Sequence, residues 1–134
     1  MTITEFWNRL DELATSKDTS NALLEMADIL REAVELPLLI LCRRTPGRIH
    51  HLYTVFDERN PDATGNRYPI CFTGEKRRKR KTKAGTWKAM ESGEIAKVPV
   101  KKVLAYMMRS KAVGGLVFNP YDEKRSMALA KFLV

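Results

Sequence analysis

The chain has 134 residues, the size of one ordinary domain, and it is long enough to bury roughly two-thirds of the surface of the unfolded chain. Its 44% hydrophobic and 30% charged residues exclude a disordered chain, and the longest apolar run, seven residues from 36 to 42, excludes a membrane span. The 24 basic residues exceed the 16 acidic ones, but seven cations lie between residues 76 and 83, and without them the balance is 17 to 16, which excludes a global positive field.

Two helices are predicted at the N-terminus. Thr2 and Glu5 have the spacing of a capping box, and helical periodicity continues to Ala14. Turn residues follow, and a second apolar periodicity predicts a helix that ends near Glu35. The first residues lack the basic segment and cleavage site of a secretory signal, so we expect a cytoplasmic protein.

Strands are predicted from Pro37 onward. The run "PLLILCRR" is typical of a strand buried on both faces, and "HHLYTVFD" reads as a second strand that pairs with it as a hairpin. The polar stretch "ERNPDATGNR" predicts an exposed loop, after which "YPICFT" resumes the sheet. Cys42 and Cys71 lie in these apolar runs, where we expect buried, reduced thiols.

The second half repeats the alternation of strand and helix. "IAKVPV" alternates, Pro99 suits an early helix position, and an apolar stripe from Val100 to Met108 predicts a helix that Gly114 or Gly115 stops with a positive φ. "GLVFNP" predicts a buried strand, and "SMALAKFLV" a strand or a helix start. The expected fold is an α/β (α+β) single domain, residues 1–134, with two N-terminal helices first and a mixed β-sheet of about five to six strands covered by helices.

The segments "YPICFTGE" and "VPVKKVLAYMMRSKAVGGLVFNPYDE" resemble the N-terminal domain of the SseB family, named for enhanced serine sensitivity in bacteria. The resemblance spans roughly residues 20 to 134 and is sharpest in a six-residue motif: Gly115, Leu116, Val117, Phe118, Asn119 and Pro120. It implies a bacterial α/β domain without established catalytic residues. The dense basic run departs from the mixed-charge helix of the family. We interpret Gly115, Asn119 and Pro120 as structural, because a helix stop and a turn explain them from backbone chemistry.

The basic run has two interpretations. Its cations could neutralise phosphates of a nucleic acid or another polyanion, with Trp87 stacking on a base; the residues are Lys76, Arg77, Arg78, Lys79, Arg80, Lys81 and Lys83. Runs of like charge are more often a solvated loop or helix face.

No metal, cofactor or catalytic site is predicted. His50 and His51 would point to opposite faces of a strand, which is poor geometry for one metal ion. A nucleophilic Cys42 or Cys71 would need an accessible, thiolate-stabilising environment, which an apolar strand does not provide.

Three functional hypotheses follow. The first is a non-enzymatic, cytoplasmic bacterial domain of SseB type that acts through contacts with a protein partner. The alternative is nucleic-acid or polyanion binding through residues 76–83. A thiol enzyme is the third and least favoured hypothesis.

Overall fold

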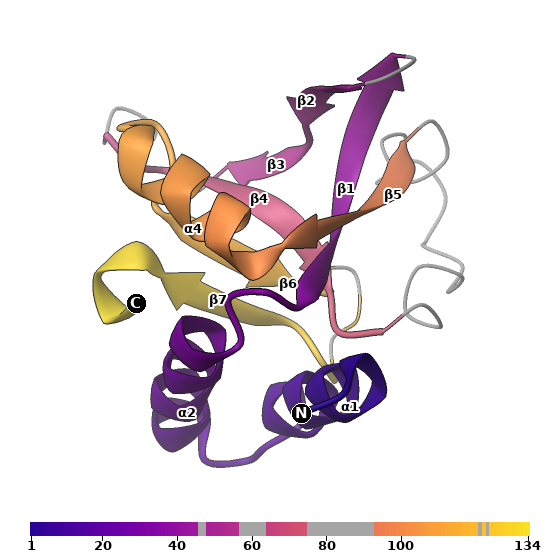
Figure 1. The fold of residues 1–134 in the computed structure, drawn as a ribbon. Helices are drawn as coiled ribbons and strands as arrows, with labels where there is room; N and C mark the ends of the chain where they lie inside the picture. The colour runs from indigo at the N-terminus through magenta and orange to yellow at the C-terminus, as the bar shows by residue number, and fades with distance from the viewer. Residues whose placement is uncertain (46–47, 57–63, 75–92, 121, 123) are drawn as a thin grey trace.

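The computed structural model describes residues 1–45, 48–56, 64–74, 93–120, 122 and 124–134 (Figure 1). Its elements, in chain order, are α1 (Ile3–Ala14), α2 (Thr19–Glu32), β1 (Pro37–Thr45), β2 (Arg48–Leu52), β3 (Thr54–Phe56), β4 (Arg67–Phe72), β5 (Glu94–Pro99), α4 (Val100–Arg109), β6 (Gly115–Phe118), β7 (Met127–Ala130) and the 3-10 turn η2 (Lys131–Leu133).

The predicted fold class is confirmed: two N-terminal helices precede a mixed sheet. The order β2-β1-β4-β6-β7 forms the main path, β5 pairs with the other edge of β1, and β3 pairs with β4. β2 and β3 are separated by Tyr53 alone, so they form one bent strand that pairs first with β1 and then with β4. The backbone of Tyr53 joins the two partners, because its N–H donates to Leu41 O at 3.2 Å and its carbonyl accepts from Ile70 N at 3.1 Å.

The predicted hairpin of the first two strands is confirmed, since β1 and β2 pair antiparallel. β4 and β6 are the parallel pair, with Ile70 opposite Val117 and Cys71 opposite Phe118. Between these two strands the chain passes through α4 and through β5, which lies on the far side of β1. Because β4 and β6 are parallel neighbours, their carboxyl ends lie side by side.

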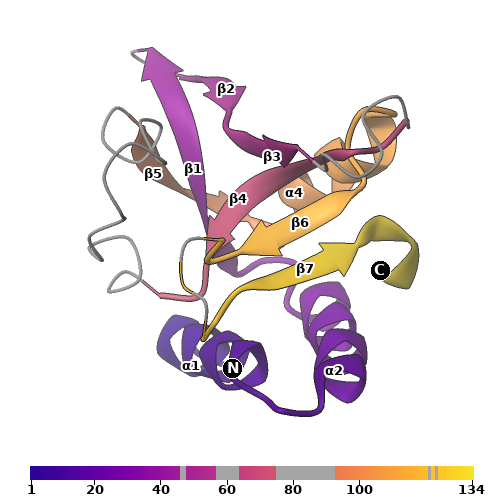
Figure 2. The ribbon, with the colours of Figure 1, turned by 180° about the vertical axis from the view of Figure 1, so that it is seen from behind.

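Side chains pack on both faces of the sheet. The larger core joins α1, α2 and α4 to alternate strand residues such as Ile40 and Phe118. The intervening residues face the other way and form a second cluster: Leu39, Leu41, Ile70, Phe72 and Val117. Figure 2 shows this second face, with α4 behind the strands. Burial of successive residues from Leu38 to Cys42 explains the unbroken apolar run that predicted β1.

The second helix is shorter than predicted, ending at Glu32 rather than near Glu35. The reason lies in α4, which begins beside this segment. The carbonyls of Val34 and Leu36 accept hydrogen bonds of 2.9 Å from the N–H groups of Lys101 and Val100. Residues 34–36 therefore satisfy the first amides of α4 in place of continuing α2.

The predicted role of the glycine pair as a helix stop is wrong. α4 ends at Arg109 with Ser110 as its C-cap, and among the described glycines a positive φ occurs only at Gly65. Gly114 and Gly115 are required by close backbone approaches. A Cβ at Gly114 would lie 1.8 Å from Gly65 O, and one at Gly115 would lie 2.0 Å from the carbonyl oxygen of Leu129 in β7.

The predicted early helix position of Pro99 is wrong, since Pro99 ends β5 and is the N-cap of α4. No helix in the described part of the chain combines the length and apolar character that a membrane crossing requires.

Candidate functional site

A buried polar cluster lies at the carboxyl ends of β4 and β6, an edge where α/β sheets often place functional groups. Thr73 follows β4 and is 1% exposed, and Asn119 follows β6 and is 0% exposed. The Thr73 N–H donates to Asn119 Oδ1 at 3.2 Å, and Asn119 Nδ2 donates to Thr73 Oγ1 at 2.9 Å. The side chain of Asn119 thus joins the two strand ends through the backbone and the side chain of Thr73.

Asn119 has a left-handed backbone with a φ of 49°, which an Asn tolerates better than most residues. Its N–H donates to Cys71 O at 2.9 Å, which continues the ladder of the parallel strands. Its Nδ2 also donates to Arg125 O at 3.2 Å, so the amide holds the following turn as well.

Helix α1 adds a carboxylate to this cluster. Thr73 Oγ1 donates to Asp11 Oδ1 at 2.7 Å. Arg125 lies between two acids, with its Nε 3.6 Å from Asp11 Oδ1 and its Nη1 4.0 Å from Asp122 Oδ2. The first of these is an ion pair without a hydrogen bond. The arrangement ties α1 to two strand ends, which are 62 and more residues away in the sequence.

The local sequence patterns do not group Asp11 or Thr73 with the turn that contains Asp122 and Arg125. These three segments are far apart along the chain, which hides their contact. The available signal was a polar residue directly after each of two buried strands, Thr73 and Asn119. That signal becomes informative once the strands are known to be parallel neighbours.

The two thiols lie in the sheet, as predicted, and both are buried and outside any disulfide. Burial raises the pKa of the Cys71 thiol well above its ordinary value, because the thiolate would lose its hydration. A thiol in this state is a poor nucleophile and a poor metal ligand.

The other predicted site residues fall outside the described residues. These are Lys76, Arg77, Arg78, Lys79, Arg80, Lys81, Lys83 and Trp87. The backbone of His50 and His51 lies in β2, and their side chains are not among those described. Within the described ranges, no group of three or more His, Cys, Asp or Glu side chains could hold a metal ion.

A surface groove lies along the two N-terminal helices, and we call it the α1–α2 groove. It consists of two adjacent hollows that share Met1 and Ile29. One has a volume of about 380 Å³ and is lined by Met1, Glu5, Arg9, Glu25, Asp28 and Ile29. The other has a volume of about 340 Å³ and is lined by Met1, Ile29, Glu32, Ala33, Glu35 and Leu36.

Comparison with family models, with curated proteins and with solved structures gave no match. The resemblance to SseB therefore stays a prediction from the sequence.

Proposed function

We propose that this chain is a non-enzymatic, cytoplasmic bacterial domain of SseB type that works through contacts with another protein. The α1–α2 groove is the proposed contact surface.

The observation that carries this proposal is the open, partly apolar groove on the helical layer. Apolar side chains are also exposed on both helices, with Ile3 44% and Leu24 52% accessible. Exposed apolar surface that polar residues surround is characteristic of protein interaction sites.

The polar cluster at the strand ends supports a structural role in preference to a catalytic one. The side-chain amide of Asn119 forms hydrogen bonds with the N–H and hydroxyl of Thr73 and with Arg125 O. The hydroxyl of Thr73 also donates to Asp11. Groups that are engaged in this way fix the strand ends and α1. The raised pKa of Cys71 likewise favours a thiol that packs in the core.

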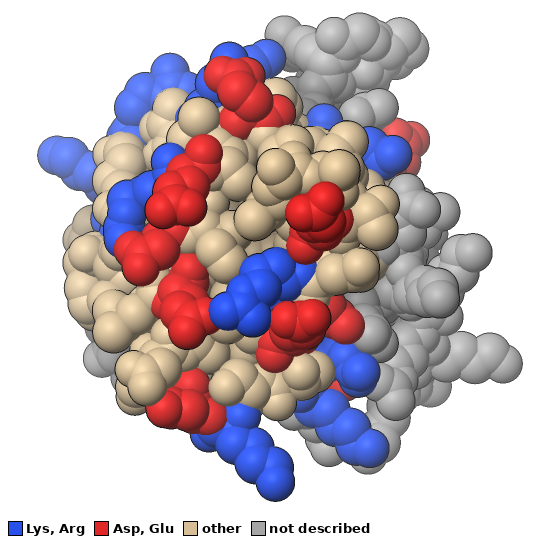
Figure 3. Space-filling view, turned by 60° about the horizontal axis from the view of Figure 1, so that its bottom comes forward, with Lys and Arg blue, Asp and Glu red and all other residues tan. Residues whose placement is uncertain are grey.

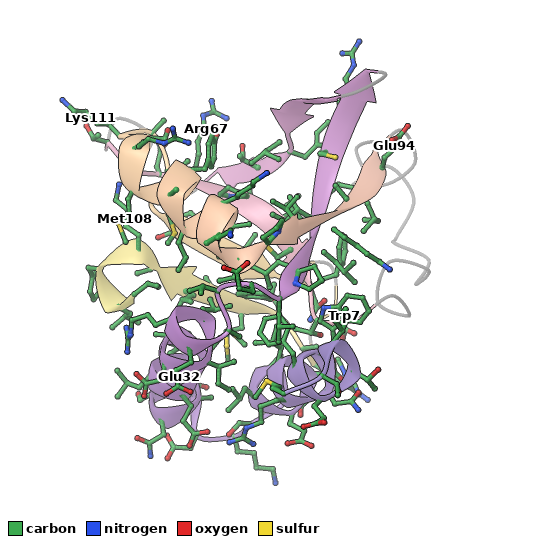
Figure 4. All side chains as sticks on the ribbon, in the orientation of Figure 1. Trp7, Glu32, Arg67, Glu94, Met108 and Lys111 are labelled. Atoms are coloured by element: carbon green, nitrogen blue, oxygen red, sulfur yellow. The ribbon has the colours of Figure 1, made fainter. Side chains whose placement is uncertain are left out.

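A photoreactive amino acid placed at Leu24 in cells that naturally contain the protein tests the proposal. Leu24 lies one helical turn before Asp28 and two before Glu32, so it shares their face of α2. We expect a light-dependent covalent adduct of higher mass, and none from Lys111, an exposed residue distant from this face (Figure 4). Equal labelling from both positions, or from neither, would contradict the proposal.

The alternative function is binding of a nucleic acid or another polyanion. Seven cations between residues 76 and 83 favour it, since they are dense enough to displace several counterions from a phosphate backbone. The two functions differ in their response to salt, because the contribution of phosphate contacts falls steeply as ionic strength rises.

A further inference from the structure

The lining of the α1–α2 groove is partly apolar. The exposed Met1 and the half-buried Ile29 line both hollows, and the half-buried Ala33 and Leu36 line the second hollow. Each hollow has the volume to hold one or two side chains of a bound peptide. Met1 and Ile29, which both hollows share, favour one apolar side chain of the peptide at that place.

The rim of the groove is acidic. Five carboxylates line the two hollows against one guanidinium, Arg9. That guanidinium is already engaged by Glu12, at 3.1 Å, and by Glu25. Figure 3 shows this face, where acidic side chains are distributed among uncharged and basic ones.

Neighbouring cations neutralise the rim in part. Arg31 pairs with Asp28, and Lys101 Nζ lies 2.9 Å from Glu35 Oε2. Glu32 is exposed and forms no ion pair with a described residue, while Glu5 is held by the Thr2 hydroxyl. Residues 1–36, which contain α1 and α2, carry eight acidic and three basic side chains, so this part of the chain attracts cations.

We propose that the α1–α2 groove docks a cationic segment of a partner protein, in which one apolar side chain is flanked by Lys or Arg on both sides. This inference rests on the proposed function and specifies its partner. The apolar residue sits on Ile29, and the flanking cations face the acids at either end of the groove.

The spacing of the rim sets the spacing in the partner. Glu25 and Glu32 are seven residues apart on α2, which corresponds to about 10.5 Å along the helix axis. A helical segment with cations at i and i+7 and an apolar residue at i+3 or i+4 spans the same distance. Complementary charge then selects the partner, and the apolar anchor supplies affinity.

A fluorescein-labelled helical peptide of Ala and Gln, with one central Leu and two Lys on each side, is the direct probe. Its fluorescence anisotropy is titrated with the full chain at low and physiological salt. We expect binding that weakens as salt rises. Peptides with Glu in place of Lys, or Ser in place of Leu, should bind at least about tenfold more weakly, because each lacks one of the two required contacts.

Two variants with the same change in charge separate the groove from the rest of the surface. Glu32→Lys reverses a rim charge, and Glu94→Lys makes an identical change on β5, far from Glu32 (Figure 4). Both side chains are exposed, so both variants should fold. We expect Glu32→Lys to weaken peptide binding about threefold to tenfold, as expected for the loss and reversal of exposed charge pairs, and Glu94→Lys to leave it unchanged.

The remaining outcomes distinguish failure of this inference from failure of the proposed function. Equal weakening by the two variants, or equal binding of the Glu peptide, would overturn the cationic partner. Sedimentation that shows self-association, abolished by Glu32→Lys, would assign the groove to a second copy of this chain and would also overturn it. If the Leu24 adduct forms in cells and an excess of the Lys peptide does not reduce it, the contact surface stands and the partner chemistry is wrong. If no adduct forms and the peptide does not bind, both are wrong.

Discussion

At the scale of single residues, the molecule depends on side chains that connect distant segments. Asn119 is the clearest case, because one amide satisfies groups from the end of β4 and from the turn before β7. Asn119 combines a left-handed φ with complete burial. A turn residue with a polar, short side chain can adopt this backbone and still reach across to the neighbouring strand end.

Asn119→Ala should lower the free energy of unfolding by about 2–4 kcal/mol, because buried donors and acceptors lose their partner and Ala is strained at this φ. Urea denaturation measures the change. Asn119→Gly removes the same hydrogen bonds without the strain, so it should cost about 1 kcal/mol less. Two equal midpoints would show that backbone strain plays no part.

Gly115→Ala should destabilise the protein by about 2 kcal/mol or more, since the new Cβ would lie 2.0 Å from Leu129 O and 2.9 Å from Ala130 Cα. Both atoms belong to the backbone of β7 and cannot move without breaking its pairing with β6. Gly74→Ala is the matched control, because no heavy atom of the described residues, its chain neighbours aside, lies within 4 Å of its Cβ position. Thermal unfolding should show Gly74→Ala within about 0.5 kcal/mol of the parent, and similar losses in both variants would argue against the close approach.

The Cys71 thiol gives a pH dependence of known sign. Its pKa is raised in the folded state, so the unfolded chain alone ionises once the pH exceeds the ordinary value of 9.0. The contribution of Cys71 to stability is complete below that pH and is lost above it, by about 1.4 kcal/mol per pH unit. The urea midpoint should therefore decrease more from pH 8 to pH 10 in the parent than in Cys71→Ala. Equal decreases in the two proteins would show that ionisation of Cys71 does not affect stability.

At the scale of elements, α1 is held to the sheet by two different contacts. Asp11 binds Thr73 at one point. One turn earlier, Trp7 points from α1 toward the sheet (Figure 4), where its Nε1–H donates to Pro37 O at 2.9 Å. Lys97 Nζ lies 5.5 Å from the ring centroid of Trp7, so the strand next to β1 also contacts it. Trp7 packs against the clusters on both faces of the sheet.

Trp7→Phe should keep most of the packing and lose the hydrogen bond, at a cost of about 1 kcal/mol in the free energy of unfolding. Tyr106→Phe removes one polar group from a partly exposed aromatic residue on α4 and should change stability by less than about 0.5 kcal/mol. Guanidinium denaturation followed by circular dichroism compares the two. If Trp7→Phe leaves the free energy of unfolding unchanged, packing alone holds α1 on the sheet.

At the scale of the whole molecule, charge is separated along the chain. Residues 1–36 carry eight acidic and three basic side chains, and residues 76–83 carry seven cations. The near balance of charge in the rest of the chain therefore conceals an acidic N-terminal segment, residues 1–36. Two segments of opposite charge respond oppositely to a polyanion.

Replacing the seven cations of residues 76–83 with Gln tests the alternative function. If that function is correct, the parent should shift generic DNA or RNA in a gel at about 50 mM salt, with affinity falling about 10³-fold by about 200 mM for six phosphate contacts, and the Gln variant should not shift it. An electrophoretic titration at both salt concentrations measures this. A parent that fails to bind at the lower salt would eliminate polyanion binding.

The sequence by itself determined the elements and the fold class, because helical and alternating periodicities are local. Thr2 and Asp18 cap the predicted helices, and the apolar stripes of α1 and α4 face the core except at their ends, where Ile3 and Met108 are exposed. The unbroken run of β1 correctly indicated a strand buried on both faces. Each of these features depends on residues within a few turns of one another.

Only the tertiary structure decided what the polar and glycine residues do. Asp11, Thr73 and Asn119 come together across 46 to 62 residues of chain, and no local pattern encodes that distance. Gly114 and Gly115 looked like a helix stop, since glycine ends helices, yet two neighbouring backbones require them. Chain geometry brought these groups into contact, and for that reason the strand-end cluster and the groove became visible in three dimensions alone.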